Sequence, residues 1–305
     1  MGIFEAILLT IITAATPLAL AALGELVVER SGVLNLGVEG MMIIGAATGF
    51  AVAVLSGSTL IGALAAIAAG MVMASVFAAL ALGLAANQVA TGLALTILGI
   101  GLSGLIGNDF IGARRDPMAK IVVPYLSDLP VVGRVLFQQD PVVYLTVALA
   151  AGIWWFLARS RAGLTLRAVG ESHVSAHALG LPVLRIRFLA VLFGGGCAGL
   201  AGAYLSLAYT PFWSPGMTAG RGWIALAIVV FASWKPLRAL LGAYLFGGVT
   251  ILQLHAQARG WGIPSQLMSS LPYLATIFVL VIISRARKGG TDAPAALGQP
   301  FVADR

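Results

Sequence analysis

The chain has 305 residues, of which 60% are hydrophobic and only 10% are charged. Soluble domains average about 25% charged residues, so this composition excludes an ordinary soluble protein. The formal net charge is +7, but the basic residues stand in short segments between long apolar blocks. That distribution is typical of membrane loops. We therefore expect an all-α, polytopic membrane protein that does not bind nucleic acid.

Nine segments are candidates for membrane spans, because a spanning helix needs about 20 predominantly apolar residues. In chain order they are 3–23, 33–55, 59–83, 88–107, 140–157, 187–208, 221–234, 236–254 and 268–284. The second segment is rich in glycine and would become two segments if it were broken, and 221–234 is short. The sequence thus predicts a transmembrane helix bundle of about nine spans, within a range of eight to ten.

Lys and Arg residues are unevenly divided between the two sets of connections. About twelve lie on one side, which includes the 158–186 loop and the C-terminal tail, and about six lie on the other side, which includes the 108–139 loop. The positive-inside rule places the first set in the cytoplasm. We expect one transmembrane domain, residues 1–288, with its N-terminus outside. Residues 289–305, rich in Gly, Ala and Pro, are expected to form a disordered cytoplasmic tail.

Four polar residues lie at the starts of two predicted spans. Asn35 and Glu39 are four positions apart, so on a helix they would share one face. A carboxylate within a span costs about 2.5–3.5 kcal/mol on insertion scales and normally faces protein or water. Asn87 and Gln88 begin another span. We expect all four near the inner end of a translocation path or in its supporting network. The alternative is that they only cap helices and tie them together.

The 163–180 stretch is too polar to cross a membrane. Ser172 as N-cap, Gly180 at the end and Pro182 just beyond predict a short helix to about residue 179. Such a helix is marginal alone and needs a surface to dock on. His173 and His177 are four positions apart, but no other His or Cys lies nearby in the sequence to complete a metal site. We therefore expect a surface pair.

The run from Glu29 to Met41, Glu-Arg-Ser-Gly-Val-Leu-Asn-Leu-Gly-Val-Glu-Gly-Met, resembles the signature segment of permease subunits of bacterial ABC importers for nucleosides and simple sugars. Further matches follow in the same order along the chain. They are Asn87–Gly92, Arg167–Glu171 with Ala176 and Leu179–Gly180, Gly220–Ala227, and Pro236–Gly247. The resemblance covers about residues 20–285, and the branched-chain amino-acid and ribose permeases are related.

This resemblance implies that the 158–186 loop contains the coupling helix, which sits in a groove of a separate ATPase subunit. The residues expected at that contact are Arg167, Gly170, Glu171, Ala176 and Gly180. The sequence lacks the Gly-x-x-x-x-Gly-Lys-Ser/Thr phosphate loop, so ATP and Mg would be bound by the partner ATPase. We expect no catalytic residue, metal ligand or cofactor in this chain.

The resemblance also implies a second permease subunit in a paralogous heterodimer, an extracytoplasmic substrate-binding protein, and a place in the bacterial cytoplasmic (inner) membrane. The chain would form the translocation path for nucleosides or simple sugars. Another small solute, such as a branched-chain amino acid, a purine or a vitamin, is the alternative. An ion-coupled secondary transporter is less favoured, because Glu39 is the one convincing intramembrane acid in the sequence.

Overall fold

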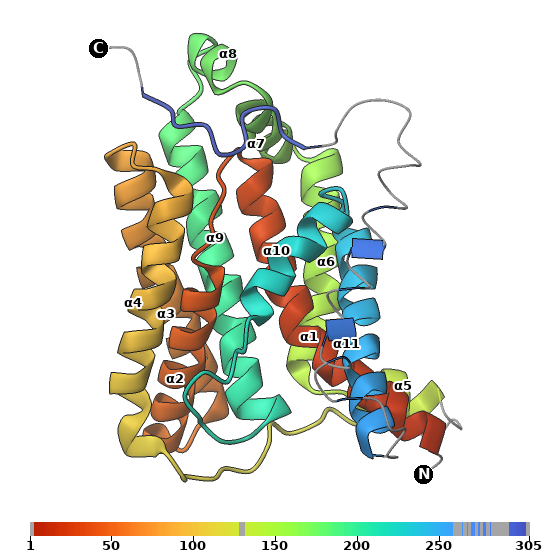
Figure 1. Cartoon of the computed structure of the whole chain (residues 1–305). Coiled ribbons are helices and arrows are strands. Elements are labelled where there is room, and N and C mark those ends of the chain that lie inside the picture. Colours follow the sequence, from red (N-terminus) through yellow and green to blue (C-terminus); the bar gives the residue numbers. More distant parts are fainter. Residues whose placement is uncertain are drawn as a thin grey trace.

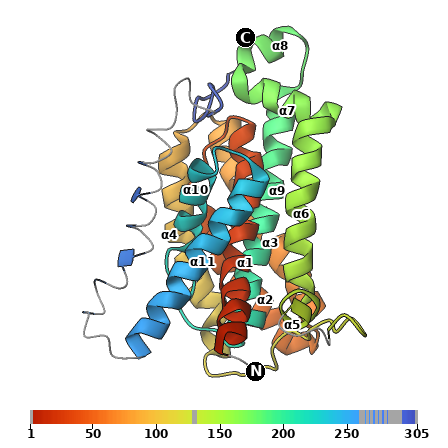
Figure 2. The same ribbon diagram turned by 90° about the vertical axis from the view of Figure 1, so that its right-hand side faces the viewer.

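The computed structural model describes residues 3–127 and 132–258, eight isolated positions between 264 and 281, and residues 293–302. Among these residues every regular element is a helix, apart from an isolated bridge between Arg114 and Phe212. The longer helices are α1 Ile3–Arg30, α2 Val38–Ser56, α3 Thr59–Ala78, α4 Gln88–Gly107, α6 Pro141–Arg159, α9 Val183–Tyr204 and α11 Pro236–Ala258. The shorter ones are α5 Val132–Phe137, α7 Arg161–Glu171, α8 His173–Ala178 and α10 Arg221–Phe231. The predicted all-α bundle is confirmed (Figures 1 and 2).

Seven of the described helices are long and apolar enough to cross a membrane. Two of them continue into a π-helical turn, η1 Ala79–Gly83 after α3 and η3 Leu205–Tyr209 after α9. The predicted span 221–234 corresponds to α10, which has only 11 residues. The predicted span 268–284 lies largely outside the described residues. The expected number of about nine is therefore an approximate prediction.

Helix α1 runs to Arg30, seven residues beyond the predicted end of the first span at residue 23. Its last turns carry Glu25 and Glu29, which are polar but buried. Glu29 accepts a hydrogen bond from the indole N–H of Trp234 at 2.6 Å, and Glu25 accepts one from the backbone N–H of Asn35 at 3.2 Å. The helix continues because both carboxylates find partners inside the protein.

Helix α2 occupies the centre of the bundle and packs against α3, α4 and α9. Small residues bring these helices together, because glycine lets helix backbones approach closely. A side chain at Gly45 would overlap the backbone of Gly199, and one at Gly202 would overlap the carbonyl of Met42. Backbones therefore touch across the centre of the molecule.

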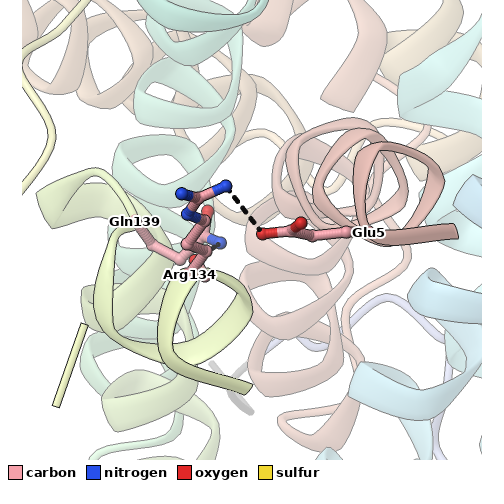
Figure 3. A network of polar contacts seen from close by, with 3 residues as sticks. All are labelled: Glu5, Arg134 and Gln139. Atoms are coloured by element: carbon pink, nitrogen blue, oxygen red, sulfur yellow. Dashed lines mark hydrogen bonds and ion pairs between the residues drawn. The ribbon is translucent and has the colours of Figure 1, made fainter. Parts of the chain in front are cut away.

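The 108–139 connection and the chain's N-terminal end lie at the same end of the bundle, with helix α5 (Figure 1). An ion pair of 3.5 Å between Arg134 of α5 and Glu5 of α1 joins them (Figure 3). The Gln139 amide donates to the Arg134 and Val135 carbonyls. Asp140 caps α6 and also accepts a hydrogen bond from Tyr204 of α9 at 2.7 Å. The connection is thus fastened to three long helices.

The C-terminal segment 293–302 corrects one expectation. Its composition predicted disorder, but these residues form a turn at the opposite end of the bundle, beside α7 (Figure 1). The backbone N–H of Ala296 donates to the Gly170 carbonyl at 2.9 Å, and that of Gly298 donates to the Gly32 carbonyl at 3.1 Å. A short segment rich in Ala and Pro is ordered here because the folded domain supplies hydrogen-bond partners for its backbone.

Candidate functional site

The segment before α2 enters the bundle without forming a helix. The backbone N–H of Leu34 donates to the Gln88 side chain at 2.8 Å, at the start of α4. The Thr96 hydroxyl, about 12 Å further along that helix, donates to the Leu36 carbonyl at 3.1 Å. Residues 33–37 therefore descend alongside the first half of α4, and α2 begins inside the bundle (Figure 1).

This geometry corrects the expectation that Asn35 and Glu39 share a helix face. Asn35 lies in the descending segment, where its side-chain oxygen accepts the backbone N–H of Gly37 at 2.9 Å. Glu39 lies in the first turn of α2. The glycine-rich stretch is interrupted before residue 38, whereas Gly40, Gly45 and Gly49 belong to a continuous helix.

A second interruption precedes α10. After the π-helical turn η3, residues 210–220 form turns and extended backbone, and α10 starts only at Arg221. Helix α10 is held at its start by Glu39, which accepts the Gly222 N–H. Just beyond its end, the backbone carbonyl of Trp234 accepts a hydrogen bond from Arg30. In transporters such interrupted helices are tolerated where the irregular backbone is buried in protein or lines a cavity.

The Glu39 carboxylate joins the two interruptions. It accepts the Thr218 hydroxyl at 2.6 Å and the backbone N–H groups of Gly220 at 2.9 Å and Gly222 at 2.6 Å. A carboxylate at a helix N-terminus is favourable, because the first N–H groups are unpaired and carry partial positive charge. Glu39 is buried, and these three bonds offset the cost of taking its charge out of water.

Two glycines make this approach possible. Gly220 has φ +81°, a left-handed conformation that other residues adopt at a cost. A Cβ atom on Gly222 would lie 2.5 Å from the backbone nitrogen of Glu39. The pattern Gly220-Arg221-Gly222 was therefore a readable signal for a close contact at this helix start, although its partner was not readable.

The sequence analysis did not single out the residues beside this junction. Arg221 lies at the start of α10, where its guanidinium donates to the Met217 and Thr218 carbonyls. The guanidinium also lies over the Tyr209 ring, 5.8 Å from the centroid. Trp223 lies two residues after Arg221 and is 51% exposed. The start of α10 therefore carries a cation that packs on an aromatic ring, and an exposed Trp lies two residues further on.

Asn87 and Gln88 lie together at the start of α4. The Asn87 side chain caps the helix by accepting the Ala90 N–H at 3.0 Å. Gln88 is buried, and its amide nitrogen has no hydrogen-bond partner among the described residues. Both line a cavity of about 270 Å³ together with the C-terminal segment. Its lining residues are Ala85, Ala86, Asn87, Gln88, Val89, Gly298 and Pro300.

Helices α7 and α8 form an elbow beyond the end of the bundle (Figures 1 and 2). The predicted short helix is confirmed: Ser172 caps α8 by accepting the Ser175 N–H at 3.2 Å, and Gly180 follows with φ +78°. Helix α7 was not predicted as a separate helix. Its own cap is Ser160, which accepts the Gly163 N–H at 2.9 Å.

The five predicted coupling residues are divided between the two faces of this elbow. Glu171 and Gly180 are exposed, Arg167 is half-buried, and Gly170 and Ala176 are buried. Gly170 packs directly on the Arg30 carbonyl at the end of α1. The outward side of α8 is mixed: Val174 is 67% exposed and Leu179 just beyond the helix is 80% exposed, and Ser175 and His177 are exposed as well.

A known protein family matches most of this chain. A family model described as the permease component of branched-chain amino acid transport systems matches residues 7–283. The chain belongs to this permease family. It is a multi-pass membrane protein and the permease subunit of an ABC transporter.

Individual relatives agree with this assignment. TsgC13 of Haloferax volcanii, whose name reads "putative glucose ABC transporter permease protein", is 43% identical over 95% of each chain. The guanosine ABC transporter permease protein NupQ of Bacillus subtilis is 34% identical over 94% of this chain and 93% of its own. NupP, also named as a guanosine permease of Bacillus subtilis, is 24% identical over 87% of this chain and 78% of its own. These proteins are similar to the permease along nearly its whole length.

Proposed function

We propose that this permease lines the path of an importer for nucleosides or simple sugars in the bacterial cytoplasmic membrane. The observation that carries the solute class is the similarity, at 43% and 34% identity, to permeases named for glucose and guanosine. Both solutes are neutral and rich in hydroxyl groups. A branched-chain amino acid is the second candidate, supported by the description of the family.

The path runs along the face of the subunit where α10 starts. The half-buried guanidinium of Arg221, the ring of Tyr209 and the exposed indole of Trp223 offer the hydrogen-bond donors and stacking surfaces that a sugar or base needs. Glu39 and Asn35 hold the two interrupted backbones behind this face. Their role in the proposal is to support the path.

Asn87 and Gln88 belong to the inner end of the path. The cavity of about 270 Å³ beside them and the unpaired amide nitrogen of Gln88 support a contact with solute or water there. Gln88 also holds the descending segment through Leu34. One residue thereby links the inner cavity to the start of α2.

The energy source in the proposal is a separate ATPase chain that binds ATP and Mg and docks on the α7–α8 elbow. The exposed apolar residues Val174 and Leu179, next to the exposed Glu171, give that elbow a surface suited to a protein groove. The buried residues Gly170 and Ala176 pack against the rest of the protein and so position the elbow. Arg167 and Gly180 are the remaining residues of the proposed contact. This chain supplies no catalytic group and no cofactor ligand in the proposal.

A second, paralogous permease and an extracytoplasmic substrate-binding protein complete the assembly. NupQ and NupP, two guanosine permease proteins from one organism, both match this chain. That pairing supports a heterodimer.

Uptake into proteoliposomes tests this proposal. The permease pair and the ATPase are reconstituted with the substrate-binding protein, and labelled guanosine, glucose and leucine are compared with and without ATP. We expect ATP-dependent uptake of guanosine or glucose that survives a protonophore. Uptake driven by an ion gradient without ATP, or ATP-dependent uptake of leucine alone, would contradict it.

Charge reversal at Glu171 tests the docking surface in the same vesicles. Glu171→Lys should lower ATP-dependent uptake about tenfold or more, because it places a like charge or an unpaired cation in the interface. Asp109→Lys is the matched control, since Asp109 is also exposed but lies at the opposite end of the bundle. Equal uptake by both variants would show that Glu171 does not contact the ATPase.

A further inference from the structure

The C-terminal segment 293–302 is tied to two parts of the domain that are far apart in the sequence. Its backbone pairs with Gly170 at the end of α7 and with Gly32 just after α1. The Ala295 N–H also lies 3.4 Å from the Glu171 carboxylate, which accepts it. The segment therefore bridges the end of the transmembrane bundle and the elbow.

Phe301 provides the main side-chain contact of this segment. Its ring lies between His173 and His177 of α8, with both imidazole centroids 5.3 Å away and nearly edge-on. Phe301 is 8% exposed and packs in one apolar cluster with Val169, Ala176 and Val183. One aromatic ring thus fills the space between α7, α8 and the start of α9.

Arg187 of α9 locks the same junction from inside. Its side chain is fully buried and donates to the carbonyls of Ser31 at 3.2 Å and Gln299 at 3.1 Å. A third donor lies 3.2 Å from Nδ1 of His173. Because a guanidinium only donates, that imidazole nitrogen must accept and therefore carries no proton. Burial and the nearby Arg187 charge lower the pKa of His173 below its ordinary value of 6.5.

The two faces of α8 therefore have different surroundings. The inward face, with His173 and Ala176, rests on Phe301 and Val183, whereas Val174 points outward and is exposed. A six-residue helix does not hold its shape or place by itself. The C-terminal segment therefore packs against one face of α8, while the other face of α8 is exposed to solvent.

We propose that residues 293–302 form a strap that positions the coupling helix α8, and that Phe301 and Arg187 are its positioning residues. The strap fixes the height and tilt of the outward face of α8, so that movement of a docked ATPase is passed to α1 and α9. The part of this proposal that concerns ATPase docking rests on the proposed function. The part that concerns α8 itself stands on the permease alone.

Hydrogen exchange on the purified permease tests the second part without any transport. In the intact protein the α8 amides of Ala176 and Leu179 are hydrogen-bonded to Ser172 and Ser175. Phe301→Ala should speed exchange in the peptide that covers α8 by about tenfold or more, while peptides from α2 and α4 keep their rates. Phe301→Leu should restore most of the protection, and Val302→Ala, at the exposed neighbouring position, should leave it unchanged.

A chain that ends before Ala293 serves as a second variant, because it removes the whole strap and changes no residue of the helix bundle. It should reproduce the loss of protection of Phe301→Ala. Unchanged exchange in α8 for both variants would overturn the proposal.

The coupling part is measured as ATP hydrolysed per solute imported in the reconstituted system. Phe301→Ala should raise this ratio several-fold, and Phe301→Leu should return it towards that of the intact permease. A merely structural strap would lower the amount of assembled complex and leave the ratio constant, and that result would overturn the positioning role. If the intact permease imports neither guanosine nor glucose, the solute proposal fails while the exchange result still decides the strap.

Discussion

Glu39 is hydrogen-bonded to a segment about 180 positions further along the chain. Its polarity inside a span marked it as a residue that must face protein or water. The identity of its partners was not predictable, because nothing local to Thr218 or Gly220 refers to residue 39. Sequence reasoning therefore identified the buried group correctly but left its role open between path and support.

Replacing Glu39 with Gln tests how much this contact stabilises the fold. The amide group keeps one acceptor oxygen, but its NH₂ would face a backbone N–H group of α10. We expect a loss of about 1–3 kcal/mol, the usual cost of an unsatisfied buried group. The measurement is thermal unfolding of the purified permease in detergent.

Glu5→Gln is the control for that measurement. Glu5 is also a carboxylate near a helix end, but its ion pair with Arg134 involves a half-exposed guanidinium. Because half of that guanidinium is in water and Glu5 lacks the three hydrogen bonds of Glu39, we expect a smaller loss of stability for Glu5→Gln. An equal loss of stability in Glu39→Gln and Glu5→Gln would show that the three hydrogen bonds of Glu39 contribute little to stability beyond the effect of its charge.

Helix α10 illustrates what patterns reveal at the scale of an element. Its apolar length was visible and too short for a span, and the structure explains this by the irregular segment 210–220 before it. The cap of α8 at Ser172 was predictable because the signal is local. The end of α1 and the order of residues 293–302 were not, since both depend on partners from distant parts of the chain.

The close approach of α10 to α2 predicts the outcome of a glycine substitution. Gly222→Ala should destabilise the permease by about 1–3 kcal/mol, because the added methyl group meets the backbone of Glu39 and forces the two helices apart. Gly152→Ala in α6 is the matched control, since a methyl group there meets nothing within 4 Å. The control should stabilise by up to about 1 kcal/mol through helix propensity. Thermal unfolding of both proteins checks the difference, and a neutral Gly222→Ala would refute the tight contact.

At the scale of the whole molecule, the structure separates two ends. The 108–139 connection with α5 lies at one end, and α7, α8 and residues 293–302 lie at the other (Figure 1). This is the relative arrangement that the distribution of basic residues predicted. Hydropathy and charge therefore anticipated the bundle and its two ends, while the interruptions before α2 and α10 needed three-dimensional contacts.

Labelling of single cysteines decides which end faces the cytoplasm. Tyr125 belongs to the 108–139 connection and Val302 to the C-terminal segment, and both are exposed. The native Cys197 is buried and serves as an unlabelled background. In intact cells an impermeant maleimide should label Tyr125→Cys at once and Val302→Cys only after permeabilisation. Labelling of both from the same side would contradict the predicted orientation.

The central position of α2 has a consequence for permeability. A helix surrounded by α3, α4 and α9, with backbones in contact at Gly45 and Gly199, occupies the axis along which a pore through one subunit would run. One copy in a lipid bilayer should therefore be electrically silent and impermeable to small dyes. In the proposed pair of permeases, each subunit would then form one side of the path, and leakage would depend on the contact between the two subunits.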